Sequence, residues 1–181
     1  MVGYVVVPGI GGSDDAHWQT RWEQRWGADS VRIEPRSWSH PELPDWVEAI
    51  ERAVTMAEAQ NDEIALVAHS LGCWAVSTWL QQAADRRVRG VLLVAPPDPT
   101  GDAFPAVAAP TFVSVVARPL PCRSVVVAST NDPYCDVRTA RKYASSWGSE
   151  VEVVGERGHL NSASALGDWA QGWEALERLA H

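Results

Sequence analysis

Short runs of apolar residues alternate along the chain with longer segments in which apolar residues recur every three or four positions. The short runs are rich in β-branched side chains and are apolar throughout, which is typical of strands that are buried on both faces. They predict six strands, at Tyr4–Val7, Val31–Ile33, Ile64–Ala68, Gly90–Val94, Ser124–Ala128 and Glu150–Val154. We therefore expect a parallel sheet that helices cover on both sides.

The periodic segments between these runs predict helices that connect successive strands. Trp18, Trp22 and Trp26 are spaced four apart, as on one face of a helix. Asp45 and Glu48 have the spacing of a capping box, which predicts the start of the next helix. Further helices are expected over Gly72–Ala84, near Val137–Trp147 and from about Asp168 to Leu179. The alternation of strands and helices indicates one α/β domain over residues 1–181.

The segment 95–122 interrupts this alternation. It holds seven of the twelve prolines, with Phe104, Val107 and Phe112 between them. A connection of this length is uncommon in a compact domain unless it has a function. We expect it to line a pocket, and the alternative is a stiff surface crossover with no role in catalysis.

Composition and charge narrow the class of function. The chain has 181 residues, is 46% apolar and 21% charged, and has a net charge of −8. A chain of this length and composition can bury a core and is not a disordered protein. Because an acidic chain without a basic run repels phosphate groups, we expect neither nucleic acid nor a membrane surface as a partner.

Three cysteines, Cys73, Cys122 and Cys135, have neither a paired framework nor a metal-binding spacing. They predict free thiols in a reducing compartment. The start of the chain has no cationic segment, and its apolar run is too short for a signal peptide or a membrane span. We therefore expect a cytoplasmic protein that needs no metal or organic cofactor.

The main chemical signal follows the third predicted strand. The sequence Ala68-His-Ser70-Leu-Gly72 places a serine between an apolar strand and a helix, with small residues two positions before and after it. A serine on such a sharp turn has a strained backbone, and small flanking residues let the strand and the helix approach each other. The Leu71 N–H at the start of the helix is a candidate oxyanion donor. The pattern predicts a nucleophile at Ser70.

A serine nucleophile needs a base. His159 lies in a glycine-flanked loop directly after the sixth predicted strand, where catalytic groups gather in parallel sheets. His69 is adjacent to Ser70 and is interpreted as a structural neighbour, and His181 ends the chain and is expected to be mobile. His159 is therefore the candidate base.

The base in turn needs an orienting carboxylate. Asp132 follows the fifth predicted strand directly and is the candidate acid. Asp136 is a competing candidate that could instead cap the next helix, and Asp98, after the fourth strand, is a weaker one. The order Ser70, Asp132, His159, with each residue at a strand exit, is the order of the α/β-hydrolase triad.

The first strand ends in Pro8-Gly-Ile10-Gly11-Gly-Ser, which brings backbone close to a ligand. The N–H group of Ile10 or of Gly11 could complete an oxyanion hole with that of Leu71. A dinucleotide-binding fingerprint is the competing interpretation. It lacks the third glycine, where Asp14 stands, and the carboxylates of Asp14 and Asp15 would repel a pyrophosphate.

Together these motifs resemble the small serine hydrolase family typified by retinoblastoma-binding protein 9. The resemblance covers nearly the whole chain. It rests on the Pro-Gly-x-Gly-Gly-Ser opening with Trp18 soon after, Trp38 and Trp46, Ala-His-Ser70-Leu-Gly, Ser-x-Asn-Asp132-Pro-Tyr, and Gly-His159-Leu-Asn with Gly167-x-Trp169. It implies a three-layer α/β-hydrolase fold whose six parallel strands are ordered 2-1-3-4-5-6, and a Ser70, Asp132 and His159 triad that hydrolyses an ester or amide.

The residues and the resemblance together predict a serine hydrolase that cleaves a carboxylic ester or related acyl bond of a small molecule through an acyl-enzyme. One alternative is a binding module on a hydrolase fold, without turnover. Another is an acyltransferase or thioesterase that uses the same triad.

Overall fold

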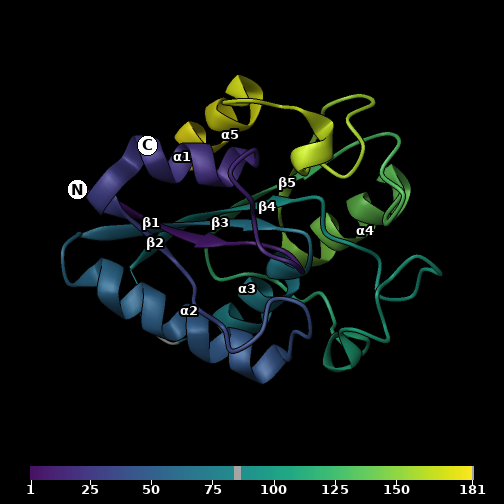
Figure 1. Ribbon diagram of the computed structural model, residues 1–181, viewed down its shortest axis with the longest axis horizontal. Coiled ribbons are helices and arrows are strands. Elements are labelled where there is room, and N and C mark those ends of the chain that lie inside the picture. Colours follow the sequence, from purple (N-terminus) through teal and green to yellow (C-terminus); the bar gives the residue numbers. More distant parts are fainter. Residues whose placement is uncertain (84–86, 181) are drawn as a thin grey trace.

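The predicted apolar runs form a sheet of parallel strands (Figure 1). The structure, a computed structural model, describes residues 1–83 and 87–180, so the predicted helix end at Ala84 and the terminal His181 lie outside the described residues. The strands are β1 (Val2–Val7), β2 (Ser30–Arg32), β3 (Glu63–His69), β4 (Val88–Val94), β5 (Arg123–Ala128) and β6 (Glu150–Val153). Every neighbouring pair is parallel, and the order is β2-β1-β3-β4-β5-β6. The predicted sheet and its strand order are confirmed.

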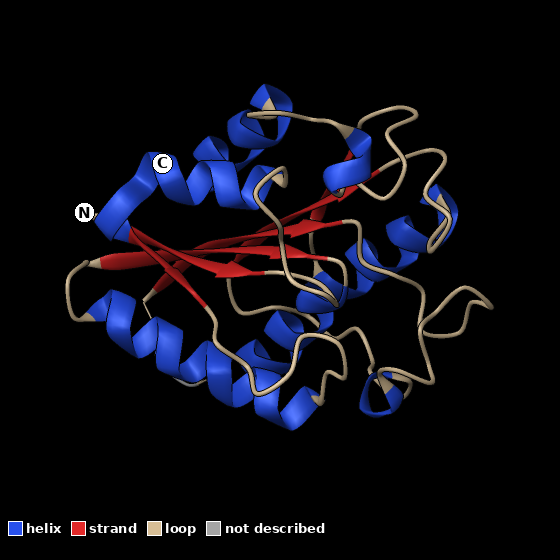
Figure 2. Ribbon diagram, viewed as in Figure 1, coloured by secondary structure: helices blue, strands red, loops and turns tan. Residues whose placement is uncertain are grey.

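Helices cover both faces of the sheet (Figure 2). They are α1 (Trp18–Trp26), α2 (Leu43–Glu58), α3 (Leu71–Gln82), α4 (Val137–Trp147) and α5 (Ala170–Ala180). Helices α1 and α5 lie on one face, and α2, α3 and α4 on the other. Within residues 1–83 and 87–180, no helix combines the length and the apolar character that crossing a membrane requires.

Alternate side chains of each central strand enter two separate cores. In β3, Ala65 and Val67 pack with Trp22 of α1 and with α5, whereas Leu66 and Ala68 pack with α2 and α3. Successive side chains of a strand point to opposite faces, so a strand covered on both sides must be apolar at every position. This explains the continuous apolar runs in the sequence.

The capping box predicted at Asp45 is wrong. Helix α2 begins at Leu43 with Glu42 as its N-cap, three positions before the predicted cap, and Pro44 lies in its first turn, where the fixed φ of proline favours a helix. The Asp45 carboxylate is buried and accepts a hydrogen bond from the Arg36 N–H at 2.8 Å. Asp45 therefore holds the preceding loop against the helix instead of capping the helix.

The proline-rich segment 95–122 has two roles. Phe104 and Phe112 are buried in the same core as α2 and α3, so much of the segment covers the helical layer. Pro97 and Pro105 instead line the cavity described below. The predicted pocket lining is therefore limited to the first part of the segment.

The start of α3 passes directly beneath the end of β1. A Cβ atom at Gly72 would meet the carbonyl oxygens of Val7 and Pro8, the latter at 2.6 Å. Because both obstructing atoms belong to the backbone, no side-chain rotation could relieve the clash. A glycine at this position thus sets how closely the helix approaches the sheet.

We expect Gly72→Ala to lower the free energy of unfolding by about 3 kcal/mol, because the added methyl group forces β1 and α3 apart. Urea denaturation of the purified variant measures this change. Gly101→Ala is the matched control, since its Cβ would make contacts of 3.4 Å or longer, and its effect should stay within about 0.5 kcal/mol. Equal effects of the two substitutions would contradict the close approach at Gly72.

Candidate active site

Ser70 occupies the sharp turn between β3 and α3. Its backbone angles are φ 55° and ψ −126°, a conformation that costs energy in any residue with a side chain. The Ser70 N–H donates to the Val94 carbonyl oxygen at 2.9 Å, which ties the turn to β4. The expected strained turn is present, and it projects the Ser70 hydroxyl beyond the carboxyl end of the sheet.

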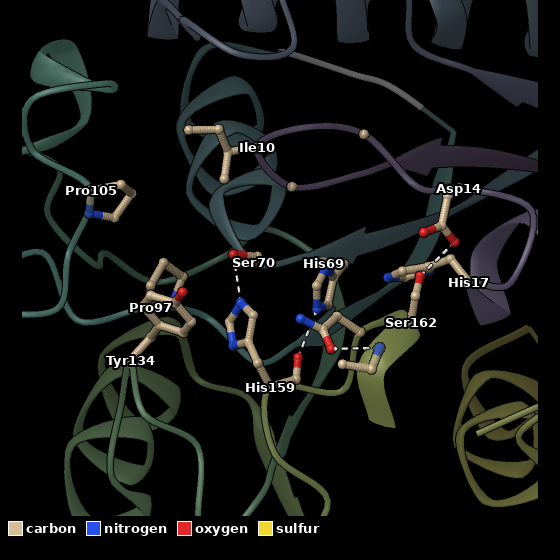
Figure 3. A pocket seen from close by; sticks show the side chains of 14 residues that line it. Ile10, Asp14, His17, His69, Ser70, Pro97, Pro105, Tyr134, His159 and Ser162 are labelled. Atoms are coloured by element: carbon tan, nitrogen blue, oxygen red, sulfur yellow. Dashed lines mark hydrogen bonds between the residues drawn. The ribbon is translucent and has the colours of Figure 1, made fainter. Parts of the chain in front are cut away.

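The structure brings Ser70, His159 and Asp132 together, although they are far apart in the sequence (Figure 3). His159 Nε2 lies 2.9 Å from the Ser70 Oγ. On the other side of the ring, His159 Nδ1 lies 2.9 and 3.0 Å from the two oxygens of Asp132. The Asp132 side chain is only 2% exposed. A carboxylate, an imidazole and a hydroxyl thus form one continuous chain of hydrogen bonds.

The two rival carboxylates are used elsewhere. Asp136 is the N-cap of α4 and accepts from the Thr139 N–H at 2.7 Å, and this backbone hydrogen bond lowers the pKa of Asp136. Asp98 accepts from the Tyr143 hydroxyl at 2.6 Å. Among the described residues, neither carboxylate is hydrogen-bonded to His159. Asp132 is therefore the carboxylate that the fold places beside the imidazole.

Two polar residues after β5 brace the loop that carries His159. The Ser129 hydroxyl accepts from the Arg157 N–H at 2.9 Å, and the Asn131 side-chain oxygen accepts from the Gly158 N–H at 2.7 Å. The Ser129 side chain is completely buried. These contacts satisfy backbone groups of the loop directly before His159, so they restrict where its ring can lie.

Two aromatic rings hold the same loop from the other side. His69 Nε2 donates to the His159 carbonyl oxygen at 2.9 Å, and Trp18 Nε1 donates to the Leu160 carbonyl oxygen at 2.8 Å. Burial lowers the pKa of His69 well below its usual value, so the ring is neutral and can donate through one nitrogen. The structure thus gives His69 a defined structural role beside Ser70: its ring positions the backbone of His159.

The candidate oxyanion donors differ in their availability. Among the described residues, the N–H groups of Leu71 and Ile10 have no hydrogen-bond partner, whereas the Gly11 N–H donates to the Trp38 carbonyl oxygen at 2.8 Å. The loop that carries Ile10 passes close to Ser70, because a Cβ atom at Gly9 would lie 2.7 Å from the Ser70 Cβ. Of the two candidates in this loop, the Ile10 amide is the one left free.

Ser70 and His159 open into a cavity of about 330 Å³. Figure 3 shows Pro97, Pro105 and Tyr134 on one side of Ser70, with His17 on the opposite side. The Tyr134 ring packs on the His159 ring with centroids 4.5 Å apart. The cavity therefore has an apolar side and a polar side, with the hydroxyl of Ser70 between them.

The cysteines and the other possible ligands are not arranged for metal chemistry. Within the described residues, no group of three or more His, Cys, Asp or Glu side chains is placed to hold a metal ion. Cys73, Cys122 and Cys135 are free thiols. Burial raises the pKa of Cys122 to about 11 and that of Cys135 to about 12, so neither is a thiolate near neutral pH.

Comparison with known proteins decides the family. A model of the serine hydrolase family matches residues 4–178, nearly the whole chain. The chain belongs to the serine hydrolase family. This confirms the resemblance carried by the motifs around Ser70, Asp132 and His159, and it supports hydrolase activity.

Solved structures agree with the family assignment. This serine hydrolase is 33% identical to a YdeN-like hydrolase from Pectobacterium atrosepticum, with a TM-score of 0.85 over 99% of this chain and 91% of the other. It is 20% identical to the ydeN gene product of Bacillus subtilis, with a TM-score of 0.73 over 99% and 98% of the two chains. Est1E from Butyrivibrio proteoclasticus, solved with ferulic acid bound, shares the fold at 11% identity and a TM-score of 0.70, over 99% and 86%. A search of the curated proteins gave no match.

Sequence reasoning assigned no role in the site to several residues that line the cavity of this serine hydrolase, among them His17, Tyr134 and Asn161. Each of these three lies within a few positions of a residue that the sequence did single out. His17 directly precedes the tryptophan-bearing helix α1 and is its N-cap, so the predicted start of that helix already pointed to this position. Tyr134 and Asn161 each lie two positions after a member of the proposed triad. Their approach to the cavity depends on how the loops fold, which no local pattern records.

We expect buried His17 to make the fold sensitive to mild acid. Burial, the largest cause, lowers the pKa of His17 from 6.5 to about 4. The unfolded chain therefore binds a proton here at a higher pH than the folded chain does. The contribution of His17 to the free energy of unfolding is fully present above pH 6.5 and is lost as the pH falls toward 4. The loss amounts to about 3 kcal/mol.

Urea denaturation near neutral pH and near pH 4 measures this loss. His17→Asn is the matched variant, because asparagine is a good N-cap but does not titrate. Its free energy of unfolding should fall less between the two conditions than that of the native chain. An equal fall would show that His17 does not titrate differently in the folded and unfolded states.

Proposed function

We propose that this serine hydrolase cleaves a carboxylic ester of a small molecule through an acyl-enzyme, with Ser70 as nucleophile, His159 as base and Asp132 as the orienting acid. The observation that carries the proposal is the chain of hydrogen bonds from Asp132 through His159 to Ser70 at the wall of a cavity. A binding module has no need of an aligned acid, base and nucleophile. The arrangement therefore favours turnover over binding alone.

The hydrogen bonds assign a role to each nitrogen of His159. Because the Asp132 carboxylate only accepts, Nδ1 carries the proton and Nε2 is free to accept one from the Ser70 hydroxyl. As the Ser70 Oγ attacks the ester carbonyl carbon, its proton moves to Nε2, and Asp132 stabilises the imidazolium that forms. That proton then passes to the alkoxide leaving group, which departs as an alcohol.

Water completes the reaction by the same route. His159 takes a proton from a water molecule as the water oxygen attacks the acyl carbon on Ser70. The carboxylic acid leaves, and the proton returns from His159 to the Ser70 oxygen. On the side of the protein, only Ser70 and His159 exchange protons in the two steps.

In the proposed mechanism, two main-chain amides stabilise the oxyanion that forms in each attack. The Leu71 N–H lies at the N-terminus of α3, where the helix dipole adds positive potential, and the Ile10 N–H comes from the loop after β1. An oxyanion donor of this kind contributes about 2.7–4 kcal/mol to the transition state in serine hydrolases. Neither amide has another hydrogen-bond partner among the described residues, which supports this assignment.

Ser70→Ala should abolish both fluorophosphonate labelling and the hydrolysis of short p-nitrophenyl esters, because it removes the attacking oxygen. Alanine keeps the Cβ atom and the same backbone demands, so the thermal midpoint should stay close to that of the native chain. Labelling followed by mapping of the modified peptide identifies the reactive serine. Persistent labelling of the variant would show that another serine is the nucleophile.

Substituting the two competing aspartates separates their roles. Asp132→Asn should lower kcat by about 10⁴-fold, because an amide stabilises the wrong tautomer of the imidazole. Asp136→Asn should keep kcat within a few-fold of the native value, since asparagine also caps a helix well. Steady-state hydrolysis of one p-nitrophenyl ester measures both. Loss of activity in the Asp136 variant alone would transfer the acid role to that residue.

A further inference from the structure

The reaction described above leaves one side of the cavity unused. Opposite Pro97 and Tyr134, the wall is formed by His17, Asp14 and Ser162 (Figure 3). These side chains take no part in the proposed proton transfers or in holding the oxyanion. Their hydrogen bonds show which polar groups on this side are satisfied and which are not.

His17 carries a buried donor that has no partner in the described part of the chain. Its side chain is 3% exposed, and its Nδ1 accepts from the Gln19 N–H at 3.2 Å, which caps α1. Since the buried ring is neutral and Nδ1 is an acceptor, the proton lies on Nε2. Within the described residues, the buried Nε2 has no hydrogen-bond partner. Buried polar groups are almost always paired, so a donor without a partner at a cavity wall is a place where an acceptor on a bound molecule would be stabilised.

Among the described residues, no neighbour of His17 accepts this hydrogen bond in the structure. Oδ1 of Asp14 accepts both from the Ser162 hydroxyl at 2.6 Å and from the Ala16 N–H at 3.0 Å. His69 packs against the His17 ring in a T-shaped contact, with centroids 4.9 Å apart, but its own Nε2 donates to the His159 carbonyl oxygen. An acceptor oxygen of a molecule bound in the cavity would therefore complete the pairing of the His17 donor.

We propose that His17 determines specificity by donating a hydrogen bond from Nε2 to an uncharged acceptor oxygen of the substrate. This rests on the proposed function, because the substrate must bring its ester carbonyl to Ser70 at the same time. The substrate class is an ester with an ether, hydroxyl or carbonyl oxygen on the part that extends from Ser70 toward His17. Asp14 beside this position would repel a carboxylate, so the recognised group is neutral.

Two substitutions of His17 separate its contact with the substrate from its role as a helix cap. Asparagine places a side-chain oxygen near the position of Nδ1, so His17→Asn keeps the cap and loses the distal donor. Glutamine places an N–H group near the position of Nε2, so His17→Gln keeps the donor and gives up the cap. A purely structural role would make the glutamine variant the more impaired of the two in every assay.

The test compares esters that differ only by an oxygen in place of a methylene group. One pair is p-nitrophenyl methoxyacetate and p-nitrophenyl butyrate, which places the acceptor in the acyl part. The other is methoxyethyl butyrate and butyl butyrate, which places it in the alcohol part. The measured quantity is the ratio of kcat/KM for the oxygen-containing ester to that for its alkyl partner. Comparing this ratio between variants cancels the intrinsic reactivity of the esters.

We expect this ratio to fall about tenfold in His17→Asn for at least one pair, the loss of one hydrogen bond to a buried donor. In His17→Gln the ratio should stay near that of the native chain even though the thermal midpoint falls. The pair that responds shows whether the acyl or the alcohol part faces His17.

Two outcomes would overturn the inference, and they differ in what else they overturn. Ratios that are equal in the native chain and both variants, with all four esters hydrolysed, would exclude His17 as a specificity residue and leave the proposed function intact. If the native chain hydrolyses none of the esters and fluorophosphonate does not label Ser70, the proposed function fails and this inference fails with it.

Discussion

The close approach of β1, β3 and α3 at Ser70 is the constraint on which the site depends. Gly72 lets the helix start directly beneath the β1 carbonyls, and Ser70 takes up the resulting turn with a positive φ. The strain is offset by the hydrogen bond from the Ser70 N–H to β4 and by the burial of the surrounding strands. One local distortion thereby exposes the hydroxyl and leaves the first amide of α3 without a partner among the residues that the structure describes.

The imidazole beside this hydroxyl is held by contacts from three separate parts of the chain. Contacts from β3, from the loop after β5 and from α1 fix the backbone on both sides of His159. The side chain is fixed by Asp132 and by packing of the Tyr134 ring. In the proposed mechanism, few of these groups have to reorganise as charge develops on the His159 ring, which is the physical advantage of a rigid site.

Strands and triad candidates could be predicted from the sequence because their signals are local. A strand buried on both faces must be apolar throughout, and residues that follow such strands meet at one edge of the sheet. The capping box at Asp45 was wrong because its carboxylate serves a tertiary contact with Arg36 that leaves no sequence pattern. The polar wall at His17 and the hydrogen bond from the Gly11 amide to Trp38 could not be predicted for the same reason. Both depend on where loops meet after folding.

The position of Ile10 separates chemistry from shape. Its amide is the proposed partner of the Leu71 amide, whereas its side chain extends into the cavity (Figure 3). Exchange of that side chain would resize the space beside the reacting bond while leaving the peptide group, and hence the electrostatics of the reaction, in place. Divergent members of such a fold could therefore acquire new substrates at this position without rebuilding their catalytic apparatus, a separation that also makes it a natural starting point for directed evolution.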